Sequence, residues 1–216
     1  MNGLAPHTGL LFDQLAKLEC IKPYLLVGGT ALSMQIDHRQ SEDLDFMKWR
    51  TSREESMEVE WAQIKEELAT IGTIEEMNLV DIDHVMFTVS GVKVSFYASP
   101  RYTPVTHPVH IQDNLYAADL LSIGAMKMEV LLRRSNFRDY YDIYSLIRYG
   151  VDFQSMVDLA LKHSGHVLHT KNLYSMLTNG SRFQTDANFS QLQPQYSVTA
   201  AEIEQYISEV IKKESR

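Results

Sequence analysis

The sequence predicts an α/β protein, in which a domain of strands and helices precedes a helical domain. The apolar run over residues 25–27 stops at two glycines, which is typical of a buried strand that ends in a tight turn. Most residues over 75–97 favour β structure, whereas from about Tyr116 the apolar residues recur at helical spacing. We therefore expect a sheet in the first half and a helical unit in the second.

The composition is that of an ordinary globular protein. The 216 residues are 44% hydrophobic and 22% charged, which suffices for a sizeable core. No apolar run approaches the roughly 20 residues of a membrane span, and no leader pattern opens the chain, so we expect a cytoplasmic protein without membrane association. A single cysteine, Cys20, excludes an intrachain disulfide framework. The net charge of −8 argues against non-specific nucleic-acid binding but leaves room for a local basic groove.

The first elements are expected to alternate between helix and strand. An amphipathic helix is predicted over residues 9–21, and Thr30 is expected to cap a short helix that reaches Ile36. An alternating strand follows at 43–46. A further helix is predicted from Thr51, where a capping residue precedes two acids, to the glycine at 72.

Three strands are expected next, near residues 75–80, 85–89 and 92–97. Ser90 and Gly91 separate the last two and indicate a hairpin turn. A change of pattern follows, because prolines at positions 100, 104 and 108 break regular structure. We place the domain boundary there, which gives a first domain over 1–108 and a helical domain over 109–216. The helices predicted in the second domain cover 119–132, 137–149, 153–163, 169–178 and a last stretch from Thr199.

The turn after the first strand has the features of a phosphate-binding loop. Gly28 and Gly29 let another group approach the backbone closely, and Thr30 follows at the start of the helix. Free N–H groups and the dipole at a helix start favour phosphate. On its own, such a Gly-Gly-Thr segment is more often only a turn.

Two carboxylates come about a dozen residues later. Asp43 and Asp45 alternate with Leu44 and Phe46, so both acids point to one face of a strand. Neighbouring carboxylates repel each other unless a cation joins them, and hard oxygen ligands beside a phosphate cradle suit Mg²⁺ that carries a nucleoside triphosphate. An Asp-x-Asp pair alone is more often a solvated strand edge, so the combination with the glycine turn makes the pattern specific.

This combination resembles the nucleotidyltransferase superfamily, and residues 28–32 with 38–46 are similar to its AbiEii/AbiGii toxin branch. That branch comprises toxins of type IV toxin–antitoxin and phage-abortive (abortive infection) systems. Two later segments also match: Ala-Met-Lys at 125–127 and Arg-Asp-Tyr-Tyr-Asp at 138–142. The resemblance covers about residues 20–150.

The resemblance implies a nucleotidyltransferase domain with a mixed sheet and flanking helices, followed by a C-terminal helical domain. It implies transfer of a nucleoside monophosphate from a nucleoside triphosphate (NTP) to an acceptor hydroxyl, with release of pyrophosphate. Asp43 and Asp45 would hold Mg²⁺ or Mn²⁺ and serve in catalysis. Gly28, Gly29 and Thr30 would cradle the phosphates.

Lys127 and Asp139 are the other catalytic residues that the resemblance implies. Lys127 would stabilise charge on the triphosphate, and Asp139 would pair with it or help to hold the acceptor. From the pattern alone, Lys127 reads as a surface lysine whose stem lies along apolar surface. Asp139 likewise reads as a stabilising acid in a first helical turn, paired with Arg138.

Arg39 and Ser41 lie between the glycine turn and the two acids. The plain interpretation is a turn with a surface charge. The resemblance instead assigns both to nucleotide binding: Arg39 pairs with a phosphate or an acid, and Ser41 contacts phosphate or orients the loop.

The sequence departs from the superfamily where many members carry a third acid. The corresponding stretch, 92–96, contains Lys93 and Ser95 but no carboxylate. Either Asp45 or Asp139 would then act as general base, or the metal would activate the hydroxyl.

The resemblance also implies partners. The acceptor would be a tRNA or another RNA end, and a separate antitoxin protein would accompany the toxin. Two alternatives stay open: a catalytically silent protein that binds a nucleotide or a partner, and an enzyme that modifies a small molecule.

Overall fold

The computed structural model describes residues 3–55, 57–184 and 186–214, and the chain divides into two compact units. The sheet unit comprises residues 1–35 and 40–119, and the helical unit comprises 36–39 and 120–216. No helix among the described residues is long and apolar enough to cross a membrane.

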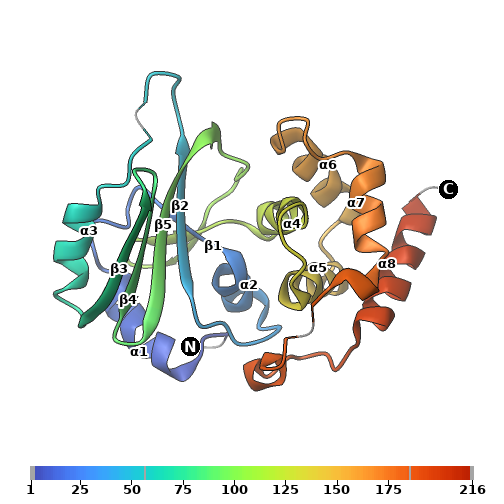
Figure 1. Ribbon diagram of the computed structural model, residues 1–216, viewed down its shortest axis with the longest axis horizontal. Coiled ribbons are helices and arrows are strands. Elements are labelled where there is room, and N and C mark those ends of the chain that lie inside the picture. The colour runs from blue at the N-terminus through green and yellow to red at the C-terminus, as the bar shows by residue number, and fades with distance from the viewer. Residues whose placement is uncertain (1–2, 56, 185, 215–216) are drawn as a thin grey trace. The chain divides into compact units, whose positions relative to one another are not determined.

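The described part of the sheet unit contains a seven-stranded mixed sheet in the order β3-β4-β5-β2-β1-β7-β6 (Figure 1). Its elements are α1 (Pro6–Leu15), β1 (Leu25–Val27), α2 (Gly28–Ile36), β2 (Leu44–Arg50), α3 (Trp61–Leu68), β3 (Ile74–Asp81), β4 (His84–Val89), β5 (Val92–Tyr102), β6 (Val109–Gln112) and β7 (Leu115–Ala117). β1 is antiparallel to β2 and parallel to β7, while β2 is parallel to β5. The predicted mixed sheet is confirmed.

Alternation along the central strands separates a core face from a polar face. Leu44 and Phe46 of β2 and Val94 and Phe96 of β5 are at most 1% exposed. The rings of Phe46 and Phe96 stack with their centroids 5.1 Å apart. Because side chains alternate along a strand, the residues between these apolar ones lie on the opposite face, where the candidate site is found.

The hairpin predicted at Ser90 and Gly91 is present, since β4 and β5 pair antiparallel up to Val89 and Val92. Ser90 and Gly91 have φ of +47° and +80°, the left-handed conformation that a tight hairpin turn needs.

Two expectations for the sheet unit were wrong. The helix predicted from Thr51 begins only at Trp61. Thr51 and Glu55 do form hydrogen bonds, but Val59 then donates its N–H to the backbone oxygen of Ile82 at 2.9 Å, which holds the chain extended ahead of α3. The first helix is also shorter than predicted, because it ends at Leu15.

The stretch after the prolines adds two strands that the sequence did not predict. β6 and β7 pair with each other, and Ala117 of β7 lies opposite Leu26 of β1. The sheet unit therefore extends to Asp119, whereas the sequence placed the boundary after residue 108.

The helical unit agrees closely with the predicted helices. Its elements are α4 (Leu120–Val130), α5 (Phe137–Tyr149), α6 (Phe153–His163), α7 (Thr170–Leu177) and α8 (Ala200–Glu214), with 3₁₀ turns at Gly180–Arg182 and Phe189–Leu192. α4 packs against α5 and α6, and α8 packs against α5 and α7. Gly150 ends α5 with φ of +104°, the left-handed conformation in which glycine is favoured.

Candidate active site

The glycine turn lies directly beside one of the two predicted metal-binding acids. β1 runs straight into α2, which begins at Gly28 with φ of +71°. Val27 lies opposite Asp45 in the antiparallel pair of β1 and β2. A Cβ atom on Gly28 would lie 3.1 Å from Asp45 Oδ2, so glycine suits both the backbone conformation and the available space. The start of α2 and the Asp45 carboxylate thus adjoin.

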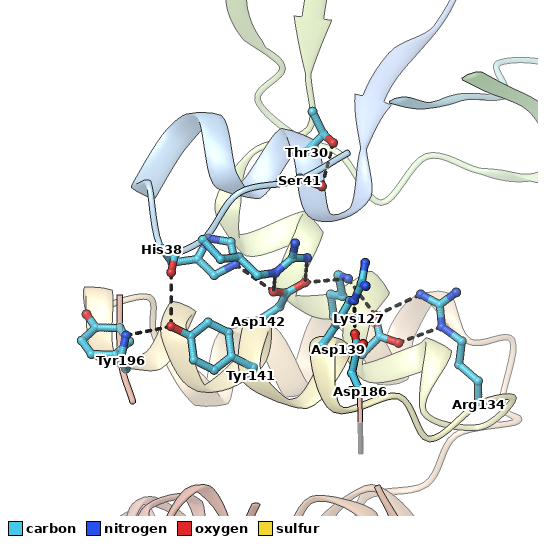
Figure 2. A network of polar contacts seen from close by, with 12 residues as sticks. Thr30, His38, Ser41, Lys127, Arg134, Asp139, Tyr141, Asp142, Asp186 and Tyr196 are labelled. Carbon is cyan, nitrogen blue, oxygen red and sulfur yellow. Dashed lines mark hydrogen bonds and ion pairs between the residues drawn. The ribbon is translucent and has the colours of Figure 1, made fainter. Parts of the chain in front are cut away.

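Thr30 does not cap this helix, contrary to the prediction, because α2 begins two residues earlier. Its side chain is buried, forms a hydrogen bond with the Ser41 hydroxyl at 2.9 Å and donates to the backbone carbonyl oxygen of Asp43 (Figure 2). Thr30 and Ser41 therefore fix the loop that leads into β2. The predicted role of Ser41 in nucleotide binding stays a prediction.

Asp43 and Asp45 both line a cavity of about 260 Å³ on the polar face of the sheet. Asp43 lies just before β2, and Asp45 is the second residue of that strand. Ser95, which lies beside Asp45 in the parallel pair of β2 and β5, donates a 2.6 Å hydrogen bond to Asp45 Oδ1. The other residues that line the cavity are Glu76, Asn78, Met86, Phe87, Thr88, Lys93 and Val94.

Ser95 stands where a third carboxylate was sought. The strand register places it next to Asp45, so its hydroxyl binds the acid where a further acid would repel it. The cavity does contain another carboxylate, Glu76, but that residue belongs to β3, two strands away from β5. The sequence could not show this, because the order and register of the strands decide which residues share a face.

The Asp43 and Asp45 carboxylates supply hard oxygen donors, the kind of ligand that Mg²⁺ prefers. Among the residues that the structure describes, no three His, Cys, Asp or Glu side chains form a group that could hold a metal ion. A cation at this place would take two protein carboxylates and complete its shell with phosphate and water oxygens. Mg²⁺ is usually held in this way when it accompanies a nucleotide.

Lys127 and Asp139 belong to a buried network in the helical unit (Figure 2), and Arg39 is a further member. Lys127 Nζ lies 2.7 Å from Asp139 Oδ1 and 2.7 Å from Asp142 Oδ2. Arg39 binds both oxygens of Asp142, through Nε at 2.8 Å and Nη2 at 3.0 Å. The predicted pairing of Lys127 with Asp139 is present, and the interpretation of Lys127 as a surface lysine was wrong, because its side chain is only 8% exposed.

The buried groups of this network keep their charges. Burial alone would raise the pKa of Asp142, but Arg39 and Lys127 overcome this effect and hold the pKa of that carboxyl well below its usual value. Burial would likewise lower the pKa of Lys127, yet Asp142 and Asp139 raise it. Asp139 also has a lowered pKa, because Lys127 and Arg134 outweigh its burial.

His38 is the neutral member of the network. Its Nε2 lies 2.8 Å from Asp142 Oδ1, while its buried Nδ1 has no hydrogen-bond partner among the described residues. Burial, together with the nearby charges of Arg39 and Lys127, lowers the pKa of His38 even though Asp142 acts to raise it. A protonated ring would leave a buried N–H unsatisfied, so the neutral form, with Nε2–H donating to Asp142, fits the site.

Two arginines extend the network towards solvent. Arg134 binds both oxygens of Asp139, at 2.7 and 3.0 Å, and Arg138 pairs with Asp186. Four cations (Arg39, Lys127, Arg134 and Arg138) thus meet three carboxylates (Asp139, Asp142 and Asp186).

The predicted site residues therefore form two groups. The sheet unit holds Gly28, Gly29, Thr30, Ser41, Asp43 and Asp45, and the helical unit holds Arg39, Lys127 and Asp139. Sequence reasoning missed Ser95, His38 and the central role of Asp142. Asp142 had one usable signal, because it follows Asp139 by three residues and so shares its helical face.

The chain is similar to a known protein family and to known structures. A family model described as nucleotidyl transferase AbiEii toxin, type IV TA system, matches residues 9–209. An uncharacterised protein of Aquifex aeolicus (strain VF5) is 27% identical over 152 residues, which make up 69% of this chain and 70% of that protein.

Two solved structures have a similar fold. JHP933 from Helicobacter pylori has a TM-score of 0.54 and 17% identity, and the match covers 96% of this chain and 93% of that one. A structure titled as a putative nucleotidyltransferase from H. pylori has a TM-score of 0.54 and 15% identity, with 97% and 98% of the two chains covered. At these identities the likeness shows the fold.

Proposed function

The chain belongs to the AbiEii family of nucleotidyltransferase toxins, and from that premise we propose that it transfers a nucleoside monophosphate from an NTP to an acceptor hydroxyl, with release of pyrophosphate. One observation carries the proposal: Asp45, which lines the cavity together with Asp43, lies against the glycine start of α2. In this proposal, phosphate groups and a divalent cation would bind next to each other.

The residues of the sheet unit have separate roles in this proposal. Asp43 and Asp45 would hold Mg²⁺ or Mn²⁺, which when bound neutralises phosphate charge and orients the reacting groups. The backbone N–H groups at the start of α2, from Gly28 to Thr30, would hold the phosphates. Thr30 and Ser41 act indirectly, since their side chains fix the backbone at Asp43.

The reaction is an in-line displacement at the α-phosphorus. The acceptor oxygen forms a bond to phosphorus, the bond to the oxygen that bridges to the β-phosphate breaks, and pyrophosphate leaves with that oxygen. The acceptor hydroxyl must also lose its proton. We propose Asp45 as the group that receives it, because Ser95 occupies the neighbouring position where a third acid would stand.

The roles of Lys127, Asp139 and Arg39 also remain proposals. Lys127 would neutralise charge on the triphosphate, as the resemblance implied. Asp139 and Asp142 would keep its ammonium group ionised and in one position, because each contacts Nζ at 2.7 Å. Arg39 would help to fix Asp142 through its two hydrogen bonds.

The acceptor and the protein partner are proposed from the family resemblance. We propose an RNA end, such as that of a tRNA, as the acceptor, and an antitoxin protein as the partner. A broad RNA-binding surface is not needed for this, since the chain has a net charge of −8.

The test is the Asp43→Ala protein, compared with wild type and with Asp13→Ala, which changes an exposed aspartate of α1 outside the cavity. Each protein is incubated with α-³²P-labelled NTPs, Mg²⁺ and total tRNA, and growth is followed when each is expressed in a bacterial host. We expect label on RNA and growth arrest with wild type and Asp13→Ala but not with Asp43→Ala, while circular dichroism spectra of all three agree. Full activity in Asp43→Ala would refute the metal assignment.

A second candidate function is binding without catalysis. The observation that favours it is Ser95, since a hydroxyl lies beside Asp45 where the resemblance led us to expect a third acid. NTP binding without label on RNA, protein or small molecules would support it. Label on a small molecule would instead indicate an enzyme that modifies a small molecule.

A further inference from the structure

The cavity that Asp43 and Asp45 line is also lined by residues of β5, β4 and β3. Figure 1 shows these three strands side by side. The pairing of these strands sets two rows of side chains across its floor. One row is Asp45, Ser95, Met86 and Asn78, and the next is Lys93, Thr88 and Glu76. Of the side chains in these two rows, the proposed function assigns a role only to Asp45 and Ser95, so most of the cavity floor is unexplained.

The geometry of the proposed reaction indicates which substrate would bind in this cavity. β2 lies between β1, which leads to the phosphate-binding turn at Gly28, and β5, which carries Ser95. In an in-line displacement the attacking oxygen and the leaving pyrophosphate lie on opposite sides of the phosphorus. If the leaving phosphates rest at the start of α2, on the β1 side of Asp45, the acceptor must approach from the β5 side, where the cavity lies.

The lining of the cavity matches the parts of a nucleotide. Among the described residues that line it, Lys93 is the one with a positive charge; it is exposed, and no described carboxylate forms an ion pair with it. Met86 is 38% exposed and offers an apolar surface for the face of a base. Asn78 and Thr88 can form hydrogen bonds with base edges or ribose, and a lysine in this position suits a phosphate.

We infer that this cavity is the acceptor subsite and that it holds the terminal nucleotide of an RNA, with Lys93 on a phosphate, Met86 under the base and Asn78 at the base edge. This inference rests on the proposed function. It makes Lys93 and Asn78 acceptor-specific residues, whereas Asp43 serves the donor as well. A serine or threonine hydroxyl of a protein acceptor would bring no phosphate for Lys93.

The test is the Lys93→Glu protein, with Lys93→Arg as the conservative variant and Lys17→Glu as the matched control. Lys17 is also an exposed lysine of the sheet unit, but it lies outside the cavity. Transfer of label to total tRNA is measured at varied tRNA and then at varied NTP. We expect Lys93→Glu to raise KM for tRNA by at least about tenfold and KM for NTP by less than about twofold, because a phosphate contact is replaced by repulsion. Lys93→Arg and Lys17→Glu should resemble wild type.

A second measurement separates this inference from the proposed function. Binding of total tRNA with a 5′ fluorescent label is followed by anisotropy without any NTP, so that no transfer is required. Weaker binding by Lys93→Glu than by Lys17→Glu would support the subsite even if wild type transfers no label. Equal binding by the two proteins, or a raised KM for NTP in Lys93→Glu, would overturn it; the latter result would make the cavity the pocket for the donor base.

Discussion

The Asp45 carboxylate lies between a residue of the neighbouring strand and the start of α2. Ser95 donates to Oδ1 from β5, and a Cβ atom on Gly28, the first residue of α2, would lie 3.1 Å from Oδ2. A side chain fixed in this way needs little rearrangement when charge gathers around it. The position of this acid is thus set by the sheet and by the turn, before any ligand arrives.

Replacing Ser95 with alanine should therefore lower the rate of transfer. Loss of the hydrogen bond frees one oxygen of Asp45, and such a bond to a charged group stabilises by about 1.5–3 kcal/mol, so we expect the rate to fall about tenfold or more. Initial rates of label transfer to RNA measure the change. The melting temperature should change little because the site is only part-buried. An unchanged rate would mean that Ser95 does not orient Asp45.

Asp142 is the residue whose charge the helical unit depends on most. Its carboxylate is fully buried and contacts Lys127, Arg39 and His38. Removing one partner from a buried ion network leaves uncompensated charge, which costs more than the network itself contributes to stability.

Asp142→Asn should destabilise the protein by about 3–5 kcal/mol, because Arg39 and Lys127 lose a buried counter-ion. Urea unfolding followed by circular dichroism measures the loss. The matched control is Asp158→Asn, which changes an acid of α6 with an exposed hydrogen bond to Gln154 and should cost less than about 1 kcal/mol. If the two variants lost equal stability, the buried network would not be a major stabilising feature.

At the scale of the elements, a glycine sets how closely two helices of the helical unit approach. A Cβ atom on Gly124 of α4 would lie 2.2 Å from Sδ of Met156 on α6, and Met156 is fully buried. Leu146 of α5 is also within 3.2 Å of that position. The close packing of α4 on its neighbours therefore requires a residue without a side chain.

Gly124→Ala should destabilise the helical unit by about 1–3 kcal/mol, because an overpacked core must shift to make room. Gly9→Ala makes the same change in α1, where nothing lies within 4 Å, and should stabilise by up to about 1 kcal/mol through helix propensity. Thermal unfolding of the two variants beside wild type compares the effects. A stabilised Gly124→Ala protein would show that α4 and α6 can move apart at little cost.

The sequence predicts elements well where local chemistry sets their ends. α5 and α6 have the predicted bounds, because Gly150 closes one helix and the Asp152 side chain caps the next by accepting from the Ser155 N–H. The sequence does not predict an element whose presence depends on pairing with residues that are distant along the chain. β7 is only three residues long and exists through its partners β1 and β6.

The same limit applies to the candidate site. Asp43 and Asp45 could be predicted, because alternation and the preceding glycines are local features. Ser95 and Glu76 could not be assigned to the cavity, since their place depends on the register of β5 with β2 and of β3 with β4. The contacts of Asp142 could not be predicted either, because its partners His38 and Arg39 lie more than 100 residues away along the chain.

At the scale of the whole molecule, charge limits how the protein can hold RNA. The chain has 20 lysines and arginines against 28 acids. Several of the cations already face carboxylates, including Arg39, Lys127 and Arg134. The protein therefore has few positive groups to offer to a phosphate backbone, and recognition should be confined to a short end of the acceptor.

Binding of RNA should accordingly depend only modestly on salt. If two or three phosphates are contacted, the affinity should fall about 7- to 20-fold between roughly 50 and 200 mM salt, since each phosphate of a single strand contributes about −0.7 to the logarithmic slope. Anisotropy titrations of 5′-labelled tRNA at several salt concentrations measure this slope, and Lys93→Glu should reduce it by about 0.7. A fall of about a thousandfold over the same range would indicate about seven phosphate contacts. Such a result would require a broad basic surface, and the acceptor would then be held by far more than one terminal nucleotide.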